Sequence, residues 1–298
     1  MSRLSTLRVG VIGLGLMGQP MARRLLAAGA RVHVHNRSLP AMQAMQALGM
    51  ECADSPAALV GQVSLAILML TDTPSVEAVI EGPAGILEGL RRAEAGTDTL
   101  VIDMGSTAVA RTRVLGARVE EAGGRFVDAP VSGGVMGATQ GSLSIMVGAG
   151  DEDFTRALPV LRELGTTITH VGGVGAGQVA RAANQVIVGL NIAAVAEALT
   201  LARAAGVDPA RVCAALGAGF AASRVMEVHA PRMNENNFEP GARATTQHKD
   251  MQQALDLAES LGIELPSTRL NRDLYQRLID AGDGELDHSA LIRILQTR

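Results

Sequence analysis

The sequence predicts an α/β chain in which a Rossmann-like, doubly wound, mostly parallel sheet is followed by an all-α domain joined through a long helix. Three observations predict this fold class. Short apolar β-type runs alternate with helical patterns as far as about residue 170. A glycine-rich turn follows the first of these runs. From residue 174 onward the strand patterns stop and helical patterns continue.

The apolar runs of the first half are predicted to be strands covered by helices on both faces. They are apolar at successive positions, which is typical of buried parallel strands. Helical patterns at 17–28, 75–90 and 108–122 separate them, and this alternation favours right-handed crossovers. The runs are RVGVIG, RVHVHN, VSLAILML, TLVIDM, RFVDAPV, LSIMVG and ITHVG.

The second half is predicted to be helical, with a long helix at 176–205 and further helices at 209–216, 248–261 and 267–281. We therefore expect two domains, residues 1–172 and residues 173–298. The long helix is more apolar than one helical domain of this size needs. We expect a homodimer or homotetramer formed through the helical domain.

Composition narrows the possible partners. Apolar residues make up 47% of the 298 residues, aromatic residues only 2%, and the formal net charge is −4. Neither nucleic acid nor an anionic membrane would attract such a chain. The most apolar helix is interrupted by Asn191 and Glu197, whereas a spanning helix needs about 20 apolar residues. We expect a cytoplasmic chain without a membrane span or a metal site.

The turn GLGLMG carries the G-x-G-x-x-G spacing directly between the first strand and the first helix. The first glycine permits a tight turn, the second lets backbone amides approach a pyrophosphate, and the third allows close helix–strand packing. This context predicts a dinucleotide site. Its predicted cofactor contacts are Gly13, Leu14, Gly15, Leu16, Met17 and Gly18.

The end of the second strand favours NADP over NAD, although NAD remains possible. Asn36, Arg37 and Ser38 stand where an acidic residue would bind the ribose 2′-hydroxyl of NAD. No carboxylate repels a 2′-phosphate there, and Arg37 can pair with one. The alternative is that Arg37 is a solvated turn residue.

Four stretches together resemble the β-hydroxyacid dehydrogenases over nearly the whole chain: GLGLMGQPMARRLL, FVDAPVSGGVMGATQGSLSIMVG, GAGQVARAANQ and HKDMQQALD. Two further stretches look more like the branch of this family that reduces tartronate semialdehyde to D-glycerate than like the 3-hydroxyisobutyrate branch. They are ANQVIVGLNIAAVAEALTLA and DHSAL. The resemblance implies an NAD(P)-dependent oxidoreductase that reduces a small 3-oxo acid or oxidises the matching 3-hydroxy acid.

The resemblance also implies roles for individual residues. It assigns Ser132, Gly133 and Gly134 to the substrate carboxylate, which a hydroxyl and exposed amides can cradle; the alternative is a simple turn. Asn184 and Gln185 would face the substrate. The alternative is that their side-chain amides only form hydrogen bonds with residues of helices packed against them. Lys249 would reach the cofactor. Leu70, Thr71 and Ser106 would line the nicotinamide side, although Gly105 stands where the family usually has serine.

Arg181 is the central departure from the family pattern, because the resemblance places a catalytic lysine there. Lysine suits proton donation because its pKa moves readily toward neutrality, whereas arginine stays protonated. Three accounts follow. Arg181 stabilises the alkoxide while water gives the proton; or the substrate differs, for instance an imine; or the chain binds NADP with weak or no catalysis.

Overall fold

The computed structural model describes residues 4–93 and 98–296. The chain divides into two compact units, Met1–Arg181 and Ala182–Arg298, called the sheet unit and the helical unit below. The division falls inside α9 (Ala176–Ala204), later than the boundary expected at residue 172. The beginning of α9 therefore groups with the sheet unit.

The sheet confirms the predicted doubly wound class. Its parallel part has the strand order expected of a Rossmann fold, with the first strand at the centre. A second group of strands extends it past β6, where β8 runs antiparallel to β6 and β7, and β9 runs parallel to β8. In spatial order the strands are β3 (Glu51–Cys52), β2 (Arg31–His35), β1 (Arg8–Ile12), β4 (Leu65–Leu68), β5 (Leu100–Asp103), β6 (Arg125–Asp128), β8 (Leu143–Gly148) and β7 (Val131–Ser132), with β9 (Gly165–Gly172) beside β8.

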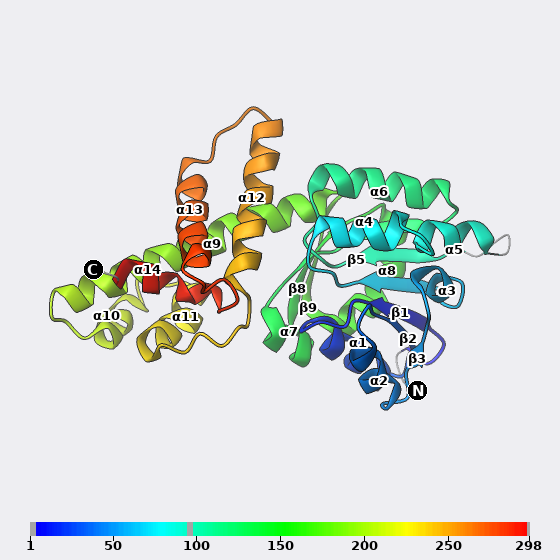
Figure 1. The fold of residues 1–298 in the computed structure, drawn as a ribbon, viewed down its shortest axis with the longest axis horizontal. Helices are drawn as coiled ribbons and strands as arrows, with labels where there is room; N and C mark the ends of the chain where they lie inside the picture. Colours follow the sequence, from blue (N-terminus) through cyan, green and yellow to red (C-terminus); the bar gives the residue numbers. More distant parts are fainter. Residues whose placement is uncertain (1–3, 94–97, 297–298) are drawn as a thin grey trace. The chain divides into compact units, whose positions relative to one another are not determined.

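Helices cover both faces of this sheet, as the continuous apolar runs predict (Figure 1). Successive strand residues point into opposite cores: Val101 belongs to one, and Leu100 and Ile102 to the other. The first core is completed by α3 (Pro56–Val60), α4 (Thr73–Glu81), α5 (Ile86–Arg92) and α6 (Val109–Glu121), and the second by α1 (Gly18–Ala27), α2 (Leu39–Gln46), α7 (Gly134–Gln140) and α8 (Asp151–Leu164).

Two predicted elements are each divided in the structure. The helix predicted at 75–90 is two helices, α4 and α5, separated at Gly82 and Pro83. Proline removes a backbone donor and disfavours helical geometry in the residue before it. The run RFVDAPV ends its strand at Asp128, and β7 begins only after Pro130. Both interruptions occur at a proline.

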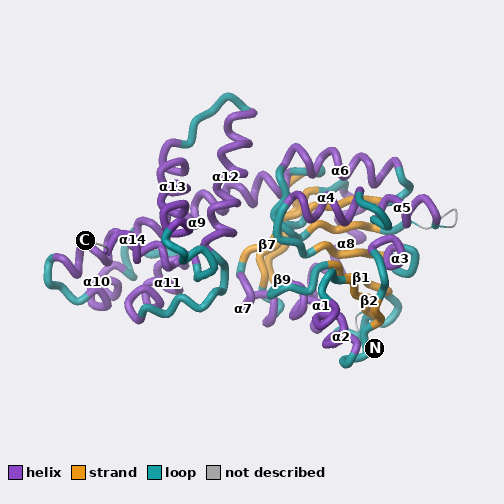
Figure 2. Tube along the Cα trace, in the orientation of Figure 1, coloured by secondary structure: helices purple, strands orange, loops and turns teal. Residues whose placement is uncertain are grey.

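The helical unit consists of helices joined by loops, whereas the strands lie in the sheet unit (Figure 2). Its core contains Ile192 and Leu199 of α9 together with Met233, Met251 and the fully buried Tyr275. Besides α9 it comprises α10 (Pro209–Leu216), α11 (Arg224–Glu235), α12 (Ala244–Ser260), α13 (Pro266–Asp280), the 3₁₀ helix η1 (His288–Ile292) and α14 (Arg293–Gln296).

α9 is long and apolar enough to cross a membrane by length and composition alone, with a mean hydropathy of 1.7 over its most apolar window. The core helix of a soluble protein meets the same criterion, and 39% of that window is buried in the structure. Ile192 and Leu199 fill the core of the helical unit, while Ile187 and Leu201 are exposed. The helix therefore has one buried side and one apolar exposed side.

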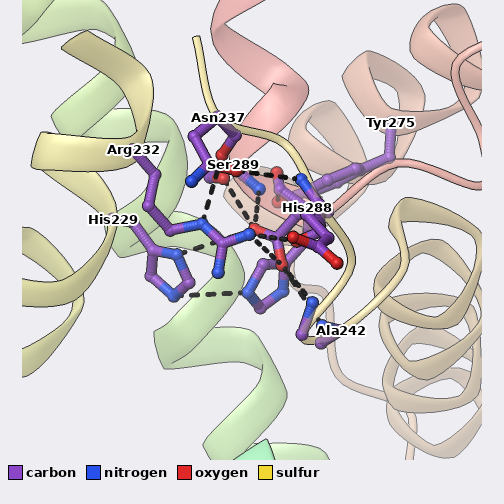
Figure 3. Close-up of polar contacts among 10 residues, drawn as sticks. His229, Arg232, Asn237, Ala242, Tyr275, His288 and Ser289 are labelled. Carbon is purple, nitrogen blue, oxygen red and sulfur yellow. Dashed lines mark hydrogen bonds and ion pairs between the residues drawn. The ribbon is translucent and has the colours of Figure 1, made fainter. Parts of the chain in front are cut away.

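A buried carboxylate anchors the end of the helical unit. Both oxygens of Asp287 accept hydrogen bonds, Oδ1 from the amide and hydroxyl of Ser289 and Oδ2 from the amides of Gly241 and Ala242. Figure 3 shows His229 and Arg232 of α11 approaching this cluster. The Arg232 guanidinium lies 3.6 Å from Asp287. Asp287 therefore ties three chain segments together.

Two histidine rings meet in the same cluster. Nε2 of His229 and Nε2 of His288 are 3.3 Å apart, and Nδ1 of His229 lies 3.7 Å from Asp287 (Figure 3). Burial lowers the pKa of His229, with Arg232 acting in the same direction and Asp287 opposing it. The folded state therefore favours the neutral ring. His229, Asp287 and His288 could each offer a metal ligand atom within 4.8 Å of the others. The Asp287 carboxylate, however, already accepts hydrogen bonds and pairs with Arg232.

We predict that acid destabilises the helical unit through His229. A histidine whose folded pKa is lowered stabilises the fold above pH about 6.5, and this stability is lost as pH falls below the unfolded pKa. The unfolding free energy, measured by urea denaturation, should fall less between pH 7 and pH 5 in His229→Gln than in the wild type. The same measurement on His170→Gln, a histidine of the sheet unit, provides the comparison for removing a histidine elsewhere in the chain. An unaltered slope in His229→Gln would contradict this assignment.

Candidate active site

The glycine-rich turn between β1 and α1 has the geometry of a phosphate-binding loop. Gly13 has a φ of +100°, and a Cβ there would overlap the carbonyl oxygen of Met69. A Cβ at Gly18 would overlap the carbonyl oxygen of Gly13. A Cβ at Gly15 would meet only open space. Two glycines thus serve the fold, while the third leaves the backbone accessible, and these residues fit a dinucleotide pyrophosphate.

The end of β2 is joined to this turn by Asn36. Its Oδ1 accepts a hydrogen bond of 3.0 Å from the amide of Leu14, and its Nδ2 donates to the carbonyl of Ser38. Arg37 and Ser38 are exposed beside it. Leu16, in the turn, is 53% exposed, and Met17 is half-buried. The glycine-rich turn and the end of β2 therefore lie at the same edge of the sheet.

Leu70 and Thr71 follow β4 at that same edge, because β4 pairs in parallel with β1 and Leu68 lies opposite Ile12. Leu70 is half-buried and Thr71 is exposed. The Thr71 hydroxyl donates to Asp72, whose other oxygen accepts from the amide of Ser75 and caps α4. The cap fixes where the loop after β4 ends.

Asp128, at the end of β6, holds the beginning of α9. Its carboxylate is fully buried and accepts hydrogen bonds from the amides of Gly175, at 2.6 Å, and Gln178, at 2.8 Å. A carboxylate can accept hydrogen bonds from the free N–H groups at the start of a helix, and the positive end of the helix dipole stabilises its negative charge. Burial nevertheless raises the pKa of Asp128 to about 6; the two amides lower it and Asp103 raises it.

Gln178 extends this anchor to the loop that follows β5. Its buried side chain accepts from the amide of Thr107 at 3.1 Å and donates to the carbonyl of Gly105 at 3.0 Å. Asp103 holds the same loop from within, because it accepts from the Gly105 amide and the Thr107 hydroxyl. Ser106 lies between these two clamped residues, so its position is set from both sides.

Arg181 lies one helical turn beyond Gln178 and contacts two of the predicted site segments. Its Nε donates to the Ser106 hydroxyl at 3.0 Å, and its Nη1 donates to the carbonyl of Val131 at 3.1 Å. Val131 directly precedes Ser132 in β7. The guanidinium is thus held between the loop after β5 and the strand that leads to the SGG sequence.

The SGG sequence forms the link between β7 and α7. Ser132 is half-buried and lies opposite Ser144 of β8. Gly133 and Gly134 have φ values of +127° and +60°, conformations that L side chains rarely adopt. The sheet unit therefore brings Arg181 and Ser106 beside the strand that carries Ser132.

The helical unit places its own predicted site residues in one network. Asn184 donates to Gln185, whose buried amide donates to Gln247 at 3.0 Å and to Asp250 at 2.8 Å. The Lys249 ammonium lies 2.9 Å from the other oxygen of Asp250. Asn184, Gln185 and Lys249 are therefore linked to one another through Asp250.

Sequence reasoning missed several of the residues that support these sites. Asp128, Gln178 and Gln247 were not singled out as site residues. Asp128 follows a buried strand, and Gln178 stands in the first turn of an apolar helix. A polar residue at such a position is the signal that could have identified both, since buried polar groups need partners.

Comparisons with known proteins match both halves of the chain. Residues 8–172 match the NAD-binding domain of 6-phosphogluconate dehydrogenase, and residues 175–295 match the NAD-binding domain of NADP-dependent 3-hydroxyisobutyrate dehydrogenase. The chain is similar to 2-hydroxy-3-oxopropionate reductase of Escherichia coli (strain K12), with 40% identity over 290 residues that cover 97% of each protein.

Two further similarities extend over nearly the full chain. 2-(Hydroxymethyl)glutarate dehydrogenase of Eubacterium barkeri is 33% identical over 290 residues, 97% of this chain and 95% of that protein. The solved structure of Mycobacterium tuberculosis 3-hydroxyisobutyrate dehydrogenase with L-serine superposes with a TM-score of 0.88 at 29% identity, covering 98% of this chain and 99% of that one. The named relatives are dehydrogenases and reductases of small hydroxy acids.

We predict an unusual pH dependence for the Asp128 anchor. A carboxyl whose folded pKa is raised to about 6 gains a proton in the folded state before the unfolded state does, so its contribution to stability rises as pH falls from 6 toward 3.8. The unfolding free energy of the wild type relative to Asp128→Asn should therefore increase by roughly 2 to 3 kcal/mol between pH 7 and pH 4.

Urea denaturation of both proteins at the two pH values measures this difference. Asp151→Asn, at an exposed position in the first turn of α8, provides the control and should show no such change. A difference that decreases toward acid would mean that the amides of α9 outweigh burial and keep the carboxylate ionised.

Proposed function

Because the chain belongs to the NAD(P)-dependent β-hydroxyacid dehydrogenase family, we propose that it reduces tartronate semialdehyde to D-glycerate with NADPH, and oxidises the matching 3-hydroxy acid in reverse. The chain is an oxidoreductase that binds a nicotinamide dinucleotide. The observation that carries the choice of substrate is the 40% identity to 2-hydroxy-3-oxopropionate reductase over 97% of both proteins. A three-carbon oxo acid with one carboxylate is the proposed substrate class.

The dinucleotide is proposed to lie on the turn after β1, and when bound it supplies the hydride that reduces the carbonyl. Open space at Gly15 and the N-terminus of α1 support placing the pyrophosphate there. Asn36, Arg37 and Ser38 support NADP, because this end of β2 offers an exposed guanidinium and no carboxylate. Leu70, Thr71 and Ser106 are proposed to line the nicotinamide side.

The substrate carboxylate is proposed to bind at Ser132, Gly133 and Gly134. The serine hydroxyl and the backbone amides of two glycines in positive-φ conformations can donate to an anion. Arg181 supports this location with its positive charge, since it donates to the carbonyl of the residue immediately before Ser132. Asn184 and Gln185 remain proposed substrate contacts, and Lys249 remains a proposed cofactor contact, on the basis of the family resemblance.

Arg181 is proposed to stabilise charge rather than to donate a proton. As hydride adds to the carbonyl carbon, the C=O π bond breaks and its electron pair moves to oxygen. A fixed guanidinium can stabilise the resulting alkoxide, but it stays protonated at any working pH. The proton that completes the hydroxyl then comes from water. Loss of a general acid typically lowers the rate by about 10²- to 10⁴-fold.

An imine substrate is the alternative that Arg181 itself favours, since reduction of an iminium needs less help from an acid. The SGG segment and the neighbouring guanidinium argue for an anionic substrate instead. Parallel assays with tartronate semialdehyde and with a cyclic imine distinguish the two. Faster NADPH consumption with the imine would overturn the proposed substrate class.

We predict that Ser132→Ala raises the KM for tartronate semialdehyde by about 10- to 100-fold, because one hydrogen bond to a charged group is lost. The KM for NADPH should stay within about twofold, and kcat should change less than the KM for the acid. The matched control is Ser144→Ala, opposite Ser132 on β8, which should leave both constants unchanged. Equal increases in both KM values would show that Ser132 does not hold the carboxylate.

A further inference from the structure

Two residues of α12 hold Gln185 of α9. Gln247 accepts a hydrogen bond of 3.0 Å from the Gln185 side-chain Nε2 and donates one of 3.0 Å to the Gln185 backbone carbonyl. Asp250 accepts a second hydrogen bond, of 2.8 Å, from the same Nε2. Gln185, Gln247 and Asp250 are 6%, 1% and 2% exposed. Both protons of the Gln185 side-chain amide are therefore donated to buried partners within the helical unit.

A glycine of α9 allows α12 to approach this closely. Gly189 lies one turn after Gln185, and a Cβ added there would lie 2.7 Å from Nε2 of Gln247 and 2.9 Å from the Met251 sulfur. Both atoms would have to move to admit a larger residue, and overpacking of this kind shifts the backbone. The short contacts between Gln247 and Gln185 therefore depend on how near the two helices lie.

The Asp250 carboxylate fixes the direction of the Gln185 amide. An ionised carboxylate only accepts hydrogen bonds. The Lys249 ammonium, 2.9 Å from the other oxygen of Asp250, is the kind of partner that a buried charge requires. The NH₂ group of Gln185 must therefore face Asp250. Its Oε1 then points the other way, where it accepts a hydrogen bond of 2.8 Å from Nδ2 of Asn184.

The direction of the Gln185 amide sets that of Asn184 in turn. The Asn184 NH₂ group faces Gln185, so the oxygen on the other side of this planar amide is turned away from Gln185. Asn184 is half-buried, whereas Gln185 is buried. Of the two amides Asn184 is the more accessible, and its oxygen is a hydrogen-bond acceptor.

We propose that Gln247 and Asp250 position Asn184 to accept a hydrogen bond from the hydroxyl on the central carbon of the substrate. The inference rests on the proposed function, because tartronate semialdehyde carries this hydroxyl between its carboxylate and its aldehyde. Methylmalonate semialdehyde, with a methyl group in place of the hydroxyl, would leave the Asn184 oxygen without a donor. A site that forms a hydrogen bond with a substrate hydroxyl discriminates strongly against the analogue that lacks it.

The proposal separates two kinds of role. Asn184 determines which substituent the central carbon of the substrate carries. Gln247 and Asp250 act on Asn184 through Gln185 and are positioning residues. Because Asp250 also pairs with Lys249, a proposed cofactor contact, Gln247 is the better residue with which to test the positioning role.

The test is the ratio of kcat/KM for tartronate semialdehyde to kcat/KM for methylmalonate semialdehyde, measured by NADPH consumption. Specificity is a ratio of kcat/KM values, so a substitution that only lowers the folded fraction does not change it. The wild type should favour the hydroxy acid by about 10- to 100-fold, the cost of leaving a buried acceptor unsatisfied. Asn184→Leu should bring the ratio to about 1 or below, since it removes the acceptor.

Gln247→Leu should lower the ratio by about 10-fold, because Gln185 loses one of the two acceptors that hold its amide. Gln247→His, which keeps one ring N–H donor and one ring acceptor, should retain more of the ratio than Gln247→Leu. The matched control is Gln276→Leu, at an exposed glutamine of α13 in the same unit, which should leave the ratio unchanged.

The outcomes separate this inference from the proposed function. Turnover of both acids by the wild type with a ratio near 1 would overturn the role of Asn184 and leave the proposed function standing. An unchanged ratio in Gln247→Leu would overturn the positioning role of Gln247. Absence of turnover of both acids, by the chain and by its Arg181→Lys variant, would overturn the proposed function and this inference with it.

Discussion

The hydrogen bonds from the first turn of α9 to the Asp128 carboxylate are the contact on which the candidate site depends. This single buried group fixes where the longest helix begins and joins it to the end of β6. Once Gln178 is fixed, its side chain clamps the loop after β5. Arg181, one turn later, then reaches Ser106 and Val131. The guanidinium is positioned by this chain of contacts.

Burying Asp128 has an electrostatic cost, because Asp103 is a second carboxylate nearby and burial disfavours charge. The cost is offset in part by the amides of α9, which donate directly to the carboxylate. Breaking one of these contacts would leave an orphaned buried group. The arrangement therefore allows little freedom in where α9 starts, which is what a precisely held guanidinium requires.

Much of the fold was predictable because its signals are local. The buried parallel strands, the GLGLMG turn and the long helix each follow from residues adjacent in sequence, and the structure confirms the fold class. The anchor was not predictable in the same way: Asp128 meets Gly175 and Gln178 across 47 and 50 positions. The division of the 75–90 helix was readable from Gly82 and Pro83, where helix geometry is disfavoured.

Arg181 is proposed to stabilise the developing alkoxide in a family reductase without supplying the proton. The most direct test is the rate of NADPH consumption with tartronate semialdehyde, compared between this chain and its Arg181→Lys variant. We expect measurable turnover by the chain and a gain of about 10²-fold or more in the variant, because lysine adds a general acid. An Arg181→Lys variant no faster than the chain itself would show that the missing proton donor does not limit the reaction.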